Sequence, residues 1–280
     1  MKRNMKILYA VMAAIIVITG GVLVYINLFG KFFGIEKEKL VSYQYSISGD
    51  MLGSLYSKSV MEYNEDSALV TIVQRKQHNH KDTVREYLVD KEILDELKAV
   101  FVKYRIKGWD NKKFTNIFIA DGASYAYGFN FETNYVSFSS QYYPEKYSSK
   151  LKEFDEIMAK YMENATLLPG LVISDAVMEA DDEQFYKPKN GKIILSVDSY
   201  RQYYLYYRIA NGTDEDRVIE SVIRLYRDGE SIPIYEKSFE YETTFFAHSS
   251  TNDSIKLKER LIPGKYRLEA FGYVTEFEIQ

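Results

Sequence analysis

The pattern of hydrophobic and polar positions begins with one long apolar stretch near the N-terminus. Residues 7–29 contain no charged side chain, and three basic residues, Lys2, Arg3 and Lys6, precede them. A helix of about 23 residues is long enough to cross the hydrocarbon layer of a membrane, which is about 30 Å thick. The pattern therefore predicts an N-terminal transmembrane anchor at residues 7–29.

The alternative interpretation of this stretch is a cleaved secretory signal peptide. The apolar run is longer than the apolar region of a signal peptide, and no cleavage site made of small residues follows it. An uncleaved anchor is therefore favoured. Because a long domain behind an N-terminal anchor is translocated largely regardless of its charge, we expect residues 1–6 in the cytoplasm and the C-terminal domains outside the cell.

The predicted anchor also offers a surface for pairing with another membrane helix. Ala10, Ala14 and Gly21 fall on one helical face, and small residues let helix backbones approach closely. The alternative is that alanine and glycine are simply common in membrane helices. With six residues before the anchor, a signal into the cell would need a partner in the membrane.

After a charged stalk at residues 30–40, the pattern alternates with a period of two, which is typical of half-buried strands. Strands are expected at residues 41–48, 54–63, 68–75, 83–89, 124–132 and 134–140. Two amphipathic helices accompany them, one starting at Asp90 and one at residues 148–164. The first places Ile93, Leu94, Leu97, Val100, Phe101 and Tyr104 on one apolar stripe. We predict an α+β domain at residues 41–166, made of an antiparallel sheet with two helices.

A boundary follows, marked by Pro169-Gly170 and an acidic run, and we place a linker at residues 167–190. Beyond it, short strands alternate with turn signals such as Asn211-Gly212 and Asp228-Gly229. The strands are expected at residues 193–199, 203–210, 218–226, 232–241, 254–261, 266–271 and 274–279. About seven short strands in such a length are typical of a β-sandwich, which we predict at residues 191–280.

The turns of this last region carry a resemblance to a known family. Asn211 to Thr213, Asp228-Gly229 and Pro263 to Arg267 resemble the turns of bacterial immunoglobulin-like domains on cell-surface and membrane proteins of Gram-positive bacteria. The region at residues 41–166 resembles uncharacterised membrane-anchored proteins of the same bacteria. The resemblance implies an immunoglobulin-like sandwich exposed at the surface, and it implies no catalytic activity.

Composition supports folded domains and excludes several classes of function. The 280 residues are 46% hydrophobic and 27% charged, which is typical of a protein that buries a core. The net charge of -4 gives no indication of the concentrated basic surface of a nucleic-acid-binding protein. The chain has no cysteine, so disulfides, thiolate chemistry and lipid attachment through cysteine are excluded. Its 26 tyrosines favour strands with one wet face.

Candidate catalytic and metal-binding patterns are weak. His78, His80 and Asp82 form an H-x-H-x-D string, but the third histidine, His248, lies in the other predicted domain, so a solvated turn is favoured over a metal site. The sequence has no G-x-S-x-G elbow and no phosphate-binding loop, and its Gly20-Gly21 pair lies inside the predicted anchor. Acidic residues lie on charged turns and helix faces, where solvation explains them. We expect no enzyme, no cofactor and no metal.

Aromatic residues are the better candidates for contact with a partner. Strand alternation forces some of the rings of Tyr203, Tyr204, Tyr206 and Tyr207 outward, and Trp109 lies in a basic connector. Exposed rings on a sheet can stack on sugars or hold a peptide. The alternative interpretation is that these rings cover strand faces and the junction between the domains.

Together these features predict a single-pass cell-membrane protein whose C-terminal domains are extracellular. We expect a non-catalytic role, in which the protein binds or presents a protein or a cell-envelope partner such as a wall glycan. The alternative is an accessory or regulatory subunit of a membrane transporter or sensor, paired through the face of Ala10, Ala14 and Gly21. A hydrolase of wall glycans is a third, less favoured class.

Overall fold

The computed structural model describes residues 31–49, 54–75, 82–109, 123–172, 191–219, 221–240 and 243–280. The predicted anchor with Ala10, Ala14 and Gly21 lies outside these residues, as do His78 and His80. Within the described part, no helix is both long enough and apolar enough to cross a membrane. The described residues are mainly β-sheet with a few helices, and they form two units.

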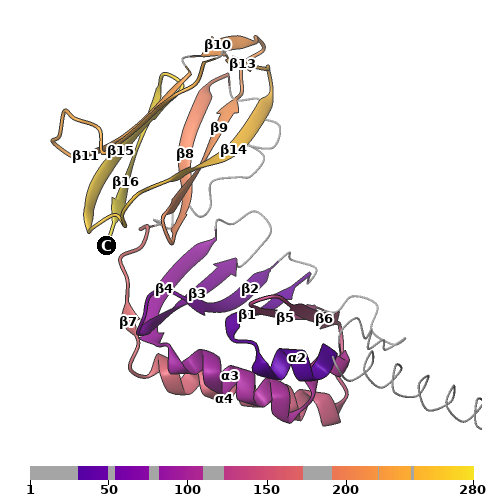
Figure 1. The fold of residues 1–280 in the computed structure, drawn as a ribbon. Coiled ribbons are helices and arrows are strands. Elements are labelled where there is room, and N and C mark those ends of the chain that lie inside the picture. The colour runs from indigo at the N-terminus through magenta and orange to yellow at the C-terminus, as the bar shows by residue number, and fades with distance from the viewer. Residues whose placement is uncertain are drawn as a thin grey trace, which may run out of the picture.

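The first unit is a seven-stranded antiparallel sheet with helices on one face (Figure 1). The strands lie in the order β6-β5-β1-β2-β3-β4-β7. Their bounds are β1 Leu40–Ser48, β2 Leu55–Glu62, β3 Ser67–Arg75, β4 Thr83–Asp90, β5 Ser124–Phe131, β6 Tyr135–Ser140 and β7 Thr166–Leu167. The helices are α2 Lys31–Lys37, α3 Glu92–Lys103 and α4 Glu145–Met162, with a 3-10 turn at Ile106–Trp109. This arrangement confirms the predicted sheet with helices.

The core of the first unit lies between the sheet and the helices. The apolar stripe predicted for α3 is buried at Ile93, Leu94, Leu97, Val100 and Phe101. Tyr43 of β1 stacks on Phe154 of α4, with ring centroids 5.5 Å apart, and Phe129 of β5 packs against both. The predicted alternation of β1 thus directs its odd-numbered rings toward the helices.

Residues of the predicted stalk belong to this unit. Ile35 of α2 is 1% exposed and is part of the first core. Glu38, just after α2, accepts hydrogen bonds from the backbone N–H and the hydroxyl of Thr133 in the turn between β5 and β6. The sequence pattern missed α2 because a helix of seven residues shows less than two turns of apolar periodicity.

The second unit is a sandwich of two main sheets and a short two-stranded ribbon. One sheet has the order β12-β11-β15-β16, the other β14-β9-β8, and β10 pairs with β13. The bounds are β8 Ile193–Arg201, β9 Tyr204–Asn211, β10 Arg217–Ile219, β11 Val222–Arg227, β12 Tyr235–Ser238, β13 Thr243–Phe245, β14 Ser249–Lys256, β15 Gly264–Ala270 and β16 Tyr273–Ile279. Its separate core includes Leu205, Tyr207, Leu225 and Leu268, all 0% exposed.

The strands of the second unit differ from the sequence prediction in several bounds, and β13 was not predicted. The strand expected at residues 218–226 is two strands, because β10 pairs with β13 and β11 pairs with β15. The strand expected at residues 254–261 lies earlier, as β14, where Ser249 to Lys256 pair with β9. Apolar periodicity finds extended segments, but hydrogen-bond partners decide where one strand ends and the next begins.

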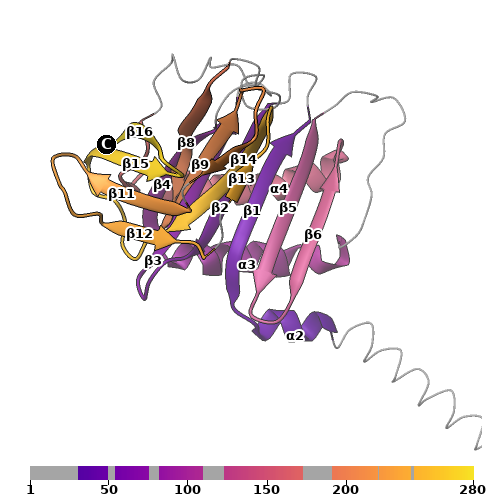
Figure 2. The same ribbon diagram turned by 90° about the horizontal axis from the view of Figure 1, so that it is seen from above.

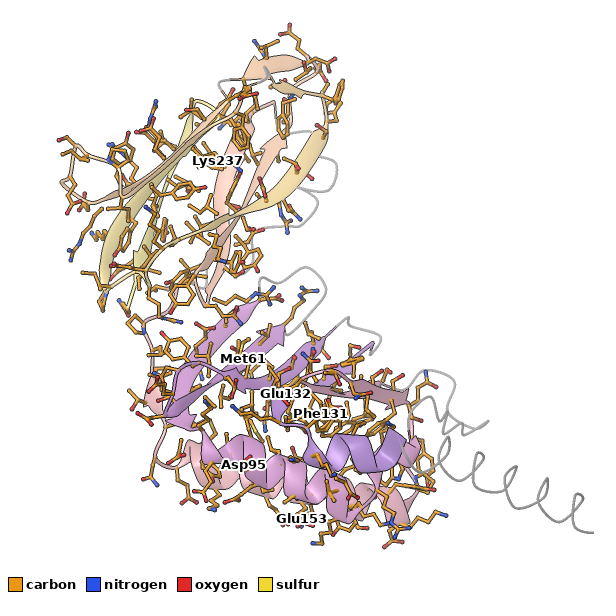
Figure 3. The ribbon with its side chains drawn as sticks, viewed as in Figure 1. Met61, Asp95, Phe131, Glu132, Glu153 and Lys237 are labelled. Carbon is orange, nitrogen blue, oxygen red and sulfur yellow. The ribbon has the colours of Figure 1, made fainter. Side chains whose placement is uncertain are left out.

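The second unit stands over the β2-β3-β4 part of the sheet, on the face opposite the helices, and leaves β5 and β6 uncovered (Figure 2). Met61 of β2 lies on the side that faces the second unit, whereas Glu153 lies in the helical layer (Figure 3). The connection beyond β7 also joins the units, because Gly170 exchanges two backbone hydrogen bonds with Gln280. Part of the predicted linker is therefore paired with the last strand.

A buried ion pair lies at the junction of the two units. Glu86 of β4 is 4% exposed, and its carboxylate accepts hydrogen bonds from the backbone N–H of Gln202, at 2.8 and 2.9 Å, and from Arg260 Nη2, at 2.7 Å. Thr71, opposite Glu86 on β3, donates a further bond of 3.3 Å. The carboxylate on the first sheet is thus satisfied mainly by the second unit.

Candidate functional site

The predicted contact residues divide into buried and half-buried side chains. Trp109 is 5% exposed and packs edge-on against Phe138 and Tyr147, with ring centroids 5.5 and 4.6 Å away. Tyr207 is 0% exposed and belongs to the sandwich core. For these two, the structure corrects the expectation of partner contact, because their rings are enclosed by their own unit.

The other three tyrosines are half-buried. Tyr204 and Tyr206 lie on one face of β9, with ring centroids 6.2 Å apart, and Arg201 lies 4.7 Å over the ring of Tyr206. Tyr203 lies at the junction, where its hydroxyl bonds to that of Tyr63 at 3.3 Å. The structure therefore brings Tyr204 and Tyr206 together, and assigns Tyr203 to the contact between the units.

The most developed candidate site is a hollow at the edge of the first unit, which we call the tyrosine hollow. It has a volume of about 520 Å³ and lies where strands β1 and β5, the β6–α4 connection and α4 meet. Strands β1 and β5 contribute Tyr45, Tyr125 and Tyr127. The connection contributes Gln141, Tyr142 and Tyr143. Five of these six side chains are thus phenols, drawn from three separate segments.

The floor of the tyrosine hollow is a cross-strand pair. Tyr45 and Tyr127 are directly opposite in the register of β1 and β5, their ring centroids are 4.8 Å apart, and they are 9% and 7% exposed. Burial raises the pKa of Tyr45 to about 12 and that of Tyr127 further, so both hydroxyls keep their protons at neutral pH. They are therefore fixed, neutral donor and acceptor groups.

The wall and rim are made by the next two tyrosines along the connection. Tyr143 stands edge-on to Tyr127, with centroids 5.9 Å apart, and its hydroxyl donates a 3.2 Å bond to the backbone carbonyl of Tyr125. Tyr142 is 41% exposed at the rim. The Ser140 hydroxyl donates to the carbonyl of Tyr142 and accepts from its N–H, which fixes the backbone there. The exposed ring is thus carried on an ordered segment.

The opposite wall is one face of α4. Ser148, Ser149, Leu151, Lys152 and Asp155 line the hollow at spacings of three and four residues, which place them on the same side of the helix. Leu151 is buried, whereas the polar members are exposed. The helix therefore presents hydroxyls, an ammonium and a carboxylate to the tyrosine rings.

The ionisation of Asp155 is shifted by its surroundings. The surrounding side chains displace part of its water and raise the pKa of its carboxyl, while the positive charge of Lys58 acts in the opposite direction. Lys58 lies across the strand register from Tyr45, on the same face of the sheet. Among the described residues Asp155 makes no hydrogen bond and no ion pair. Its acceptor capacity is therefore open to a ligand.

A second hollow, on the sandwich, lies between the β11–β12 connection and the segment after β14. It is lined by charged groups of both signs, including Lys258 and Glu230, and by Arg260. Because Arg260 is committed to Glu86 at the junction, this hollow is less suited to a separate ligand. Within the described residues no group of three or more His, Asp or Glu side chains could hold a metal ion.

Sequence reasoning missed the tyrosine hollow. The Tyr142-Tyr143 pair after β6 was a visible signal, because two adjacent large rings outside a strand cannot both be covered by sheet pairing. The contribution of Asp155 was hidden, since a single acidic residue on a helix is ordinarily solvated. Strands β1 and β5 and helix α4 line the same hollow because of the strand order in the sheet, and the periodicity of apolar residues along the sequence does not predict that order.

Comparisons with protein-family models, with curated proteins and with solved structures gave no match for this chain. The assignment of a function therefore rests on the geometry of the tyrosine hollow and on the patterns of the sequence. No relative supplies a substrate or a partner by analogy.

Proposed function

We propose that the protein is a non-catalytic binding protein, held outside the cell membrane by its N-terminal apolar segment, that recognises a protein or cell-envelope partner. The observation that carries this proposal is the tyrosine hollow. Tyrosine is enriched where proteins bind partners because its ring contributes apolar contact and its hydroxyl a hydrogen bond. A hollow built from five such rings is suited to recognition.

The second unit supports the proposal as a spacer of immunoglobulin-like type. Strands β8, β9 and β14 form one sheet, and β11, β15 and β16 belong to the other, which is the division found in immunoglobulin-like sandwiches. Tyr266, at the start of β15, donates a 2.7 Å bond to the carbonyl of Ile262, as the corner tyrosine of such folds does. Such domains on surface proteins commonly present other domains.

The contacts at the junction support a fixed arrangement of the two units. Glu86 is satisfied by Gln202 and Arg260, and the Gly170–Gln280 pair ties the connection to the last strand. A binding unit on a fixed spacer keeps its site in one orientation relative to the tether. The tyrosine hollow is lined by α4 and therefore lies on the helical side of the sheet, whereas the second unit stands on the opposite side (Figure 1).

The test is a retention assay with the full-length protein, purified in detergent and immobilised. It is offered purified cell wall and, separately, detergent-solubilised membrane from the native host, and bound material is identified by mass spectrometry. Tyr142→Ala is run in parallel, because it removes the exposed ring at the rim of the tyrosine hollow.

We expect retention of wall material or of one specific protein, reduced in Tyr142→Ala. Recovery of a transporter or sensor would favour the accessory-subunit role. Equal retention by the wild type and by the heat-unfolded protein would overturn the proposal, and release of soluble wall fragments on incubation would show that the protein is a hydrolase instead.

A further inference from the structure

We infer that the tyrosine hollow is a subsite for a neutral saccharide, occupied by one or two pyranose rings of a glycan. The inference rests on the proposed function and specifies its ligand class. It follows from three properties of the hollow, which are the ring faces, the mixture of donors and acceptors, and the balance of charge.

The first property is the layering of the rings. Tyr45 and Tyr127 are buried at the floor, Tyr143 is half-buried at the wall, and Tyr142 is exposed at the rim. A pyranose has an apolar C–H face and an edge of hydroxyls, so it can stack on one ring while its edge bonds to another group. The exposed ring of Tyr142, next to the more buried rings, provides a stacking surface beside polar groups.

The second property is the set of polar groups around those rings. Gln141, Ser148 and Ser149 are exposed; Gln141 and Ser149 each carry both a donor and an acceptor, whereas the Ser148 hydroxyl donates to the carbonyl of Glu145 and offers its acceptor side. Lys152 adds donors and Asp155 adds acceptors. Sugar hydroxyls donate and accept at once, so a ligand with many hydroxyls can use all of these groups, whereas an apolar ligand would leave them unpaired.

The third property is the balance of charge, which separates a neutral ligand from a charged one. The carboxylate of Asp155 opposes an anion, whereas Lys152 on the rim and Lys58 beside Tyr45 oppose a cation. A neutral hydroxyl-rich ligand meets no net repulsion, and it can donate to the carboxylate and accept from an ammonium in the same pose. The open acceptor capacity of Asp155 is then filled.

The size of the hollow agrees with this ligand. Small-molecule pockets measure roughly 300–1,000 Å³, and the tyrosine hollow, at about 520 Å³, falls in this range. It is open at the rim, where Tyr142, Lys152 and Asp155 are exposed, so a longer glycan can enter and leave. We therefore infer that the tyrosine hollow binds a segment of a glycan chain, at its end or within it.

The test is saturation-transfer NMR on the full-length protein in a detergent without a sugar headgroup. Three probes are titrated separately: the β-1,4-linked tetrasaccharide of N-acetylglucosamine, the β-1,4-linked tetrasaccharide of glucose, and trilysine. We expect transfer to the pyranose C–H protons of at least one tetrasaccharide. Tyr142→Ala and Asp155→Asn should each raise its dissociation constant about tenfold, since one removes the stacking ring and the other the charged acceptor.

Matched controls make the result specific to the hollow. Tyr142→Phe keeps the ring and should bind within about twofold of the wild type, because stacking dominates at the rim. Tyr135→Ala and Asp95→Asn remove an exposed tyrosine and an exposed aspartate elsewhere on the same unit, and neither should change binding. Far-ultraviolet circular dichroism of every variant establishes that the fold is kept.

Absence of transfer to both tetrasaccharides would overturn the inference, as would binding that is unchanged in Tyr142→Ala and Asp155→Asn. Binding of trilysine with loss of that binding in Asp155→Asn would overturn it in favour of a cation site. The proposed function is judged separately by the retention assay, since retention of a protein partner without saccharide binding would leave that function standing and reject this ligand.

Discussion

The ion pair between Glu86 and Arg260 provides a sharp test of how the two units are held together. Replacing Arg260 by methionine removes the guanidinium but keeps an unbranched side chain of similar length. The carboxylate of Glu86, which is 4% exposed, would then keep its bonds from Gln202 and Thr71 and lose its only formally charged partner among the described residues.

The magnitude follows from the burial of the pair. Breaking a buried ion pair by removing one partner costs about 3–5 kcal/mol, because an uncompensated charge is left behind. The side chain of Arg260 is 13% exposed, and its Nε and Nη1 have no hydrogen-bond partner in the described part of the chain. The pair is therefore not ideally satisfied, and we expect a loss near the lower end, about 3 kcal/mol.

The assay is thermal and urea unfolding of the full-length protein, followed by differential scanning calorimetry and circular dichroism. For Arg260→Met we expect the midpoint of thermal unfolding to fall by on the order of 10 °C, and we expect one of the two units to melt at a lower temperature than the other. Arg217→Met is the matched control, because Arg217 pairs with Glu215 on the surface of the same unit and its side chain is 50% exposed. Its cost should be about 0–1 kcal/mol.

The double variant Glu86→Gln with Arg260→Met completes the test. Because it removes both charges, it should be less destabilised than Arg260→Met alone. If Arg260→Met instead has the same melting temperature as Arg217→Met, the buried pair contributes no more than a surface ion pair, and it does not hold the two units together.

Three further predictions concern other sites. Burial raises the pKa of Asp155 above its ordinary value of 3.8, so the folded protein binds this proton more tightly than the unfolded chain does, and the stability contributed by the group falls as pH rises from 3.8 through the raised pKa. The Asp155→Asn variant should therefore gain stability relative to the wild type over that pH range, as measured by thermal melts from pH 3 to 7. A loss of stability that is the same at every pH would contradict this prediction. Hydrogen bonds from Thr133 lower the pKa of Glu38 below 4.5, so its contribution is present above that pH and is lost as pH falls through the lowered pKa; Glu38→Gln should be less stable than the wild type at pH 7, and the difference should shrink on acidification. Tyr266→Phe deletes the bond to Ile262 and should cost about 0.5–1.5 kcal/mol in urea unfolding, whereas Tyr273→Phe, which loses no bond recorded among the described residues, should cost less than half of that.

Local periodicity determined most of the elements. The alternation of β1 sent Tyr43 and Tyr45 to the core, and the stripe from Ile93 to Phe101 was buried as a helix, because each pattern matches the geometry of one element by itself. The turn signals at Asn211-Gly212 and Asp228-Gly229 likewise marked the ends of β9 and β11. The long apolar stretch at residues 7–29 is also a local signal, and it stays a prediction, since it lies outside the described residues.

Tertiary structure decided the rest. Whether Trp109 or Tyr207 faces a partner or a core depends on which layer covers it, and both are covered. The tyrosine hollow exists because the order β6-β5-β1 brings Tyr127 opposite Tyr45 and places both beside α4, although these segments are distant in the chain. A sequence specifies the period of each element through its neighbours along the chain, but register and layer order come from packing and from hydrogen bonds between distant segments. The candidate site, unlike the elements that build it, is therefore a property of the folded structure.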